Sequence, residues 1–173
     1  SLLAMDQLVN NAAKWHYMFG GQNSVPITIR LIIGRGWGQG PTHSQNLQAI
    51  FAHIPGLRVV IPSSPTRAYG LLLAAIRDPD PVIFLEPKRI YRTTKQLIED
   101  NGNELPLDIC FTLREGNDIT LVTWGSMVQE TIAAADAQVF GMQHHTFVGL
   151  IEAIHRAYGH AGRIRTMHAG NRD

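Results

Sequence analysis

The first part of the chain alternates between stretches with helical spacing and short apolar runs. Residues 2–18 place apolar side chains three or four positions apart and are followed by Gly20-Gly21, which predicts a helix that stops at the glycines. Residues 25–33 form a β-branched run too apolar to alternate with polar positions. Such a run predicts a strand buried on both faces of a parallel sheet.

The same order of elements is repeated further along. A helix is predicted over 44–53 and a strand over 57–61, then a helix over 65–77 and a strand over 82–85. A serine of Ser63-Ser64 can cap the helix that begins at Pro65, where proline suits the first turn. Strands separated by helices predict an α/β domain with right-handed crossovers.

The pattern changes after residue 87. Residues 88–118 are polar and aperiodic, and their length indicates an interdomain linker. A buried strand over 119–124 and an amphipathic helix over 127–137 then open a second α/β unit. The predicted organisation is a first domain over 1–87, a linker over 88–118, the start of a second domain over 119–137 and an atypical tail over 138–173.

Composition narrows the class of protein. Charged residues make up 17% of the chain and the net charge is +1, so no field attracts nucleic acid or an anionic membrane. A surface with so few charges favours contact with partner proteins. The single cysteine, Cys110, excludes an internal disulfide and a multi-cysteine zinc site, and we expect it to be buried in a protein of a reducing compartment.

The apolar runs and the first residues of the chain lead to two further predictions. No apolar run approaches the roughly 20 residues of a membrane-spanning helix. Because the helical pattern is already present near Ser1, we expect that residues of a longer protein precede it.

Candidate chemistry is concentrated in residues 34–45, where four glycines alternate with other residues before His43. The spacing fits neither a dinucleotide fingerprint nor a P-loop. His43 follows a parallel strand and precedes a predicted helix, where open α/β sheets bind ligands. The helix N-terminus would favour a neutral imidazole able to relay a proton, with Ser44 capping the helix and Gln45 holding the ring or a substrate carbonyl. A tight turn without a ligand, with His43 as a helix cap, is the alternative.

A second candidate lies in the turn after the helix predicted over 65–77. Asp78 and Asp80 stand in an Asp-Pro-Asp-Pro sequence. They suit a turn that ends the helix, or a cation site completed by loop carbonyls. Spacing alone favours the turn.

Six blocks of sequence carry a resemblance to a known family. They are residues 5–14, 17–22, 26–30, 40–45, 55–60 and 75–82, the last followed by Glu86. In order and interval they resemble the beta subunit of the thiamine-diphosphate-dependent first component of 2-oxo-acid dehydrogenase complexes, from Ser1 to about Ala137. The resemblance implies a transketolase-like pyrimidine-binding domain, with a parallel sheet and helices on both faces, then a linker and the start of the transketolase C-terminal α/β domain.

The resemblance also implies a composite active site. In this family an alpha subunit holds the diphosphate and Mg²⁺ of the thiamine diphosphate, and the beta subunit cradles the aminopyrimidine. His43 would be the catalytic residue that faces the thiazolium, with Tyr17 and Gln45 beside the cofactor. The glutamate and the aromatic residue that contact the pyrimidine would belong to a segment before Ser1. A monovalent cation such as K⁺ is implied at Ile27, Ala75, Ile76, Asp78 and Asp80.

The implied activity is oxidative decarboxylation of a 2-oxo acid, with pyruvate expected, and transfer of the acyl group to lipoamide. The implied partners are an alpha subunit and a second beta subunit in a heterotetramer, and the lipoyl domain of the acyltransferase core. The implied location is the cytoplasm of a bacterium or the mitochondrial matrix of a eukaryote. Two alternatives stay open: another transketolase-like thiamine-diphosphate enzyme, which the sequence Pro-Thr-His-Ser-Gln disfavours, and a non-catalytic interaction module of such an assembly.

Overall fold

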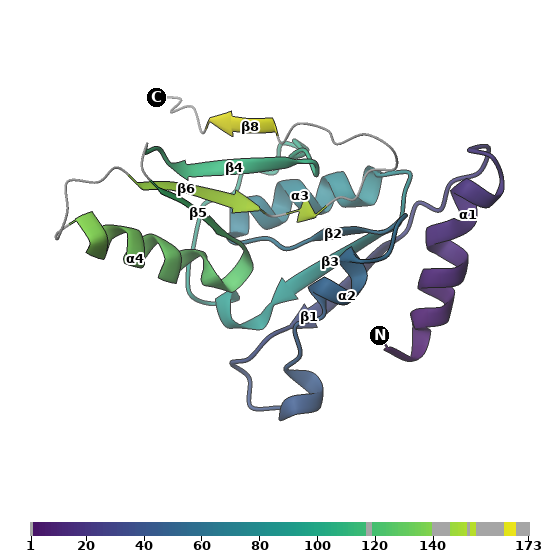
Figure 1. Ribbon diagram of the computed structural model, residues 1–173, viewed down its shortest axis with the longest axis horizontal. Helices are drawn as coiled ribbons and strands as arrows, with labels where there is room; N and C mark the ends of the chain where they lie inside the picture. Colours follow the sequence, from purple (N-terminus) through teal and green to yellow (C-terminus); the bar gives the residue numbers. More distant parts are fainter. Residues whose placement is uncertain (1, 117–118, 140–145, 152, 155–164, 169–173) are drawn as a thin grey trace.

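The computed structural model describes residues 2–116, 119–139, 146–151, 153–154 and 165–168, with side chains as far as residue 137 (Figure 1). The strands are β1 (Thr28–Ile33), β2 (Arg58–Val60), β3 (Val82–Pro87), β4 (Ile109–Arg114), β5 (Ile119–Thr123), β6 (Thr146–Ile151), β7 (Ala153–Ile154) and β8 (Arg165–His168). The α-helices are α1 (Ala13–Met18), α2 (Gln48–Ala52), α3 (Pro65–Arg77) and α4 (Val128–Val139). Shorter turns are the 3-10 helices η1 (Leu2–Ala4), η3 (Pro41–His43), η4 (Lys88–Ile90) and η5 (Gly125–Met127), and the π-helix η2 (Gln7–Ala12).

The first sheet has the strand order β1-β3-β2-β7. β3 is parallel to β1 and to β2, whereas β7 is antiparallel to β2. β1 is therefore an edge strand among the described residues, and the expectation that it is buried on both faces is wrong. Arg30 and Ile32 are exposed because α3 covers the face beside β2 and β3 and not the rim formed by β1.

Helices cover both faces of this sheet, as the sequence predicts. Because successive side chains of a strand point to opposite faces, neighbouring residues of β2 and β3 enter different clusters. The cluster on the side of η2, α1 and α2 includes Leu8, Ala13, Phe51, Val59, Ile83 and Leu85. The cluster under α3 includes Val60, Leu71, Ala75, Val82 and Phe84. Each fully buried Val, Leu, Ile or Phe contributes about 1.5–3 kcal/mol.

The helices differ in how closely they match their predictions. α3 spans Pro65–Arg77 as predicted, and the Ser64 hydroxyl accepts the N–H of Arg67 at 3.4 Å. The region 2–18 is helical throughout its described part but changes from 3-10 to π to α geometry. The helix predicted over 44–53 is limited to α2. None of the helices in the described ranges has the length and apolar character needed to cross a bilayer.

A second sheet has the order β5-β6-β4-β8. β5 and α4 confirm the strand and helix predicted over 119–137. The expectation that this strand is buried is wrong, because β5 is an edge strand among the described residues and Ile119 and Val122 are exposed. β4 forms inside the stretch expected to be a linker, and it buries Cys110 as anticipated. β6 and β8 form in the region expected to be an atypical tail, β6 parallel to β5 and β8 parallel to β4. The second unit is thus more extensive than its sequence pattern indicates.

The remaining part of the expected linker, residues 91–107, is tied to α3 by polar contacts. The Gln96 side-chain oxygen accepts the backbone N–H of Thr66 at 3.1 Å, and the Tyr69 hydroxyl donates to Asp100 at 2.6 Å. Further along, the N–H of Leu105 donates to the carbonyl of Gly70 at 3.1 Å. A Cβ on Gly70 would lie 2.6 Å from Leu105 Cγ, so the glycine allows this close approach.

Candidate functional site

The glycine loop, residues 34–40, begins where β1 ends, at the carboxyl-terminal edge of the first sheet (Figure 1). All four of its glycines have positive φ: 79° at Gly34, 111° at Gly36, 70° at Gly38 and 69° at Gly40. L-residues with a side chain rarely adopt such angles, which explains the alternation of glycine in the sequence. The N–H of Gly34 donates to the carbonyl of Gln45 at 3.0 Å, so the loop and the following turn close on themselves.

His43 is the last residue of η3, and its side chain is exposed, as is that of Gln45. The structure corrects one part of the prediction here. Ser44 does not cap a helix: its N–H donates to the Pro41 carbonyl at 3.4 Å, and α2 begins only at Gln48. His43 therefore does not lie at the N-terminus of a long helix, contrary to the prediction. What remains is an imidazole presented to the outside by a constrained loop.

The loop is open on the side next to His43. A Cβ built on Gly38 or on Gly40 would have no atom within 4 Å. A flat ring held by another chain can thus approach the backbone and the exposed side chains of His43 and Gln45. This arrangement fits residues that contact a thiamine ring from one side.

The opposite side of the loop packs against η4, which the sequence pattern did not single out. The Lys88 ammonium lies 5.4 Å from the centre of the Trp37 ring. A Cβ on Gly36 would lie 3.5 Å from Arg89 Cα, so the two backbones are close. The sequence feature that could have predicted this contact is the pair of basic residues Lys88 and Arg89 directly after β3, at the sheet edge where ligands bind.

A polar network ties β1 to β3 beside this edge. Arg30 forms an ion pair with Glu86, and the Tyr91 hydroxyl donates to Glu86 Oε2 at 2.5 Å. Burial raises the pKa of the Glu86 carboxyl, but the bonds from Arg30 and Tyr91 outweigh it and the pKa is lowered. Burial, and next the bond to Glu86, raise the pKa of Tyr91 to about 12. The network lines a cavity of about 350 Å³ together with Leu72 and Phe84.

The residues implied in cation binding lie at the other end of the sheet. Thr28 Oγ1 donates to the Ala75 carbonyl at 2.8 Å, and the N–H of Val82 donates to the Ile27 carbonyl at 2.9 Å. The start of β1, the end of α3 and the start of β3 therefore meet, and the Asp78 turn lies between the last two. The Ile76 side chain is exposed.

The fit to a monovalent cation rests on backbone oxygens. The Ala75 carbonyl accepts the Thr28 hydroxyl and the Ile27 carbonyl accepts the N–H of Val82, and a carbonyl oxygen has two lone pairs. The carboxylates are already matched: Arg58 lies 3.0 Å from Asp78 Oδ2 and 3.6 Å from Asp80 Oδ2. No group of three or more His, Cys, Asp or Glu side chains suited to a metal occurs within the part of the chain that the structure describes.

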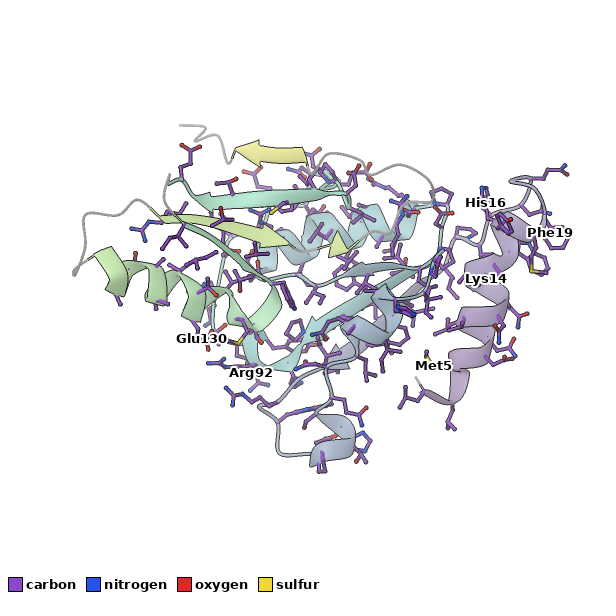
Figure 2. All side chains as sticks on the ribbon, viewed as in Figure 1. Met5, Lys14, His16, Phe19, Arg92 and Glu130 are labelled. Atoms are coloured by element: carbon purple, nitrogen blue, oxygen red, sulfur yellow. The ribbon has the colours of Figure 1, made fainter. Side chains whose placement is uncertain are left out.

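Tyr17 is not brought to the carboxyl-terminal edge where His43 lies, because Ala13 and Lys14 of its helix contact Gly56 and Pro55 just before β2. It belongs to α1, and its side chain is 73% exposed. Figure 2 shows Lys14 and His16 of the same helix, and Phe19 just after it, on the opposite side of the molecule from Glu130. Of the three residues expected at the cofactor, only His43 and Gln45 therefore share one loop region.

Comparison with known families defines the class. The family "Transketolase, pyrimidine binding domain" matches residues 3–94. This match includes the whole parallel part of the first sheet, the glycine loop and η4. The chain belongs to this family, which confirms the fold inferred from the six sequence blocks.

Within the family, the chain is similar to beta subunits of 2-oxo-acid dehydrogenases. It is 48% identical over 126 residues to "2-oxoisovalerate dehydrogenase subunit beta 2, mitochondrial" of Arabidopsis thaliana, covering 72% of this chain and 35% of that protein. It is 49% identical over 123 residues to "Pyruvate dehydrogenase E1 component subunit beta" of Acholeplasma laidlawii, covering 71% of this chain and 38% of that protein. The matched part is thus little more than a third of these relatives.

A solved structure supports the same fold. "Split gene transketolase, inactive beta4 tetramer" matches 87% of this chain and 45% of that chain, with a TM-score of 0.65 and 16% sequence identity. At this identity the likeness concerns the fold alone.

Proposed function

We propose that this chain forms the pyrimidine side of a thiamine-diphosphate site in a 2-oxo-acid dehydrogenase. The supporting observation is the exposed pair His43 and Gln45 on the glycine loop, in a chain nearly half identical to dehydrogenase beta subunits. The site needs a second wall, which an alpha subunit supplies together with the diphosphate and Mg²⁺ contacts. A second beta subunit completes a heterotetramer.

The cofactor, when bound, supplies the carbon nucleophile and the electron sink for decarboxylation of the 2-oxo acid. The contribution of this chain is orientation and proton handling. The His43 imidazole exchanges a proton with the bound acid and assists transfer of the acyl group to a lipoyl domain. Gln45 orients the ring or the substrate carbonyl by a hydrogen bond, and the carbonyls of Ile27 and Ala75 hold K⁺ at the far edge. Tyr17 remains a proposed contact to the cofactor from the partner-facing helix.

The substrate is a 2-oxo acid, with pyruvate as the first candidate. The two relatives act, by their names, on different acids of this class, a branched-chain acid and pyruvate. The location follows the same division: bacterial cytoplasm or mitochondrial matrix. Assay of pyruvate and 2-oxoisovalerate side by side distinguishes the substrates.

The decisive experiment is coexpression with an alpha subunit. Calorimetry of the purified complex should show binding of thiamine diphosphate, and the complex should reduce lipoyl domain in the presence of a 2-oxo acid. His43→Ala should leave cofactor binding intact and reduce acyl transfer by roughly 10²–10⁴-fold, the usual effect of removing a proton-transfer group. His53→Ala, a change of another exposed histidine, is the control. Normal acyl transfer by His43→Ala would refute the role.

A non-catalytic interaction module is the second candidate. Large apolar side chains are exposed on and just after α1: Trp15, Tyr17, Met18 and Phe19. Such a surface suits contact with another subunit. Formation of a stable complex with the alpha subunit, without thiamine-diphosphate binding, would favour this alternative.

A further inference from the structure

The glycine loop is connected to the second unit through η4. Lys88 contacts Trp37 of the loop, and the backbone of Arg89 lies against Gly36. The Arg89 side chain then extends to α4, where it forms an ion pair with Glu130. One short helix therefore contacts the loop with its first two residues and the second unit with its arginine.

The start of α4 is fixed relative to the first sheet. A Cβ on Gly125 of η5 would lie 2.9 Å from Ile61 Cγ2 and 3.2 Å from Pro87 Cγ, and the φ of Gly125 is +56°. This close approach places η5 against the ends of β2 and β3. Glu130, in the first turn of α4, is thereby held beside η4. In Figure 2 Glu130 lies at the end of α4 nearest the segment that contains Arg92.

The charge of Glu130 also interacts with η4 and with the glycine loop. The amide N–H of Glu130 itself lowers the pKa of its carboxyl, and Arg89 and Arg35 lower it further against the opposing effect of burial. Arg35 belongs to the glycine loop. Glu130 thus attracts positive charge on η4 and on the loop at the same time.

We propose that Arg89 and Glu130 are positioning residues: their ion pair holds η4 against the glycine loop and so fixes the orientation of His43. The proposal rests on the proposed function as far as His43 is concerned. It assigns the second unit a role at the active site, since α4 supplies one half of the pair. Neither residue contacts the substrate or the cofactor in this proposal.

A second ion pair of α4 provides a matched control. Arg114 of β4 lies 2.5 Å from Asp136, and the exposed fractions of its two side chains, 36% and 55%, are close to or above the 39% of Arg89 and the 37% of Glu130. This pair joins α4 to its own sheet and does not involve the glycine loop. A variant that lacks this pair therefore shows how far the loss of any ion pair from α4 changes the exchange rate of the glycine loop.

Hydrogen–deuterium exchange of the full chain tests the proposal without a partner. Arg89→Glu and Glu130→Arg should each raise the exchange rate of peptides covering residues 34–45 by about fivefold, while β3 keeps its protection. The double exchange of charges should restore most of the protection of the loop. Arg114→Glu should leave residues 34–45 unchanged. Arg89→Gln, which removes the pair without introducing repulsion, serves if the reversed charges prevent folding.

Unchanged exchange of residues 34–45 in the single variants would overturn the proposal, as would an equal increase in β3 or in the Arg114→Glu control. In the complex with an alpha subunit, the single variants should lower kcat several-fold with little change in KM for the 2-oxo acid, and the charge exchange should rescue kcat. If the unmodified complex has no activity while the exchange results hold, the proposed function fails and the positioning of the loop stands. If the complex is active but the exchange rates of residues 34–45 do not change in the single variants, the proposed function stands and the positioning role of Arg89 and Glu130 fails.

Discussion

The two edges of the first sheet differ in how far their polar groups are satisfied within the chain. At the amino-terminal edge, the buried Asp78 carboxylate accepts the N–H of Asp80 at 2.8 Å and pairs with Arg58. At the carboxyl-terminal edge, His43 and Gln45 are exposed on a loop of positive-φ glycines. At the amino-terminal edge, here called the closed edge, the carboxylates have partners within the chain. The carboxyl-terminal edge, here called the open edge, presents exposed side chains that another chain can contact. The contrast assigns stability to one edge and chemistry to the other.

The largest effect is expected at the closed edge, in Gly56→Ala. Gly56 has a φ of +93°, and a Cβ would lie 1.9 Å from the carbonyl oxygen of Ala13 in α1. Strain and overpacking together should lower the free energy of unfolding by about 3 kcal/mol, since each contributes about 1–3 kcal/mol. Urea unfolding of the full chain measures the loss.

Gly38→Ala at the open edge is the matched comparison. Gly38 also has a positive φ, +70°, but nothing lies within 4 Å of its Cβ position. Only the strain remains, so the cost should be about 1 kcal/mol. Equal losses in the two variants would show that close packing does not distinguish the edges.

A smaller effect is expected for Asp78→Ala. The substitution leaves Arg58, whose side chain is 26% exposed, without its nearest carboxylate and removes an acceptor for the N–H of Asp80. We expect a loss of about 2 kcal/mol. Asp80→Ala removes a more exposed partner at 3.6 Å and should cost at most about 0.5 kcal/mol. Urea unfolding measures both losses. A larger loss of unfolding free energy for Asp80→Ala than for Asp78→Ala would show that Asp78 is not the main partner of Arg58.

The helix α3 and the two strands β2 and β3 beside it were largely predictable from the sequence. The helix start at Ser64-Pro65 and the stop at Asp78-Pro79 are local signals, and α3 has the bounds that they predict. The apolar runs also located β2 and β3, because a buried strand leaves little choice of residue type. Edge position was not predictable for β1, since it depends on which strands pair and not on the composition of β1 itself.

The open edge was predictable only in part. The alternating glycines correctly marked a loop with an unusual backbone, and the family resemblance drew attention to His43. The early start of the helix after His43 was wrong because Ser44 bonds within its own turn. Lys88, Arg89 and Glu130 were missed because their contacts join residues 36 and 37 to residues 88–89 and 130, which no local period reports. The strand β4 was missed because polar residues border it on both sides, Asp108 before it and Glu115 after it.

The Glu86 network predicts a pH dependence next to the open edge. The folded-state pKa of Glu86 lies below the ordinary value of 4.5, so the stabilisation is complete above that value and is lost as the pH falls through the folded-state pKa. Since Arg30 is largely exposed, the contribution should be below about 1 kcal/mol. Glu86→Gln should flatten the acid side of a plot of unfolding free energy against pH. Arg77→Gln, which removes an exposed pair with Glu104, is the control.

The smallest effect on stability is expected at His43 itself. Its side chain is exposed at the end of η3, and the closure of the loop depends on backbone groups of Gly34 and Gln45. His43→Ala should therefore change the free energy of unfolding by less than about 0.5 kcal/mol, as for other surface substitutions. The same variant is expected to impair acyl transfer in the complex with an alpha subunit. A loss of stability comparable to that of Asp78→Ala would mean that His43 serves the fold, and the division between a closed structural edge and an open chemical edge would not hold.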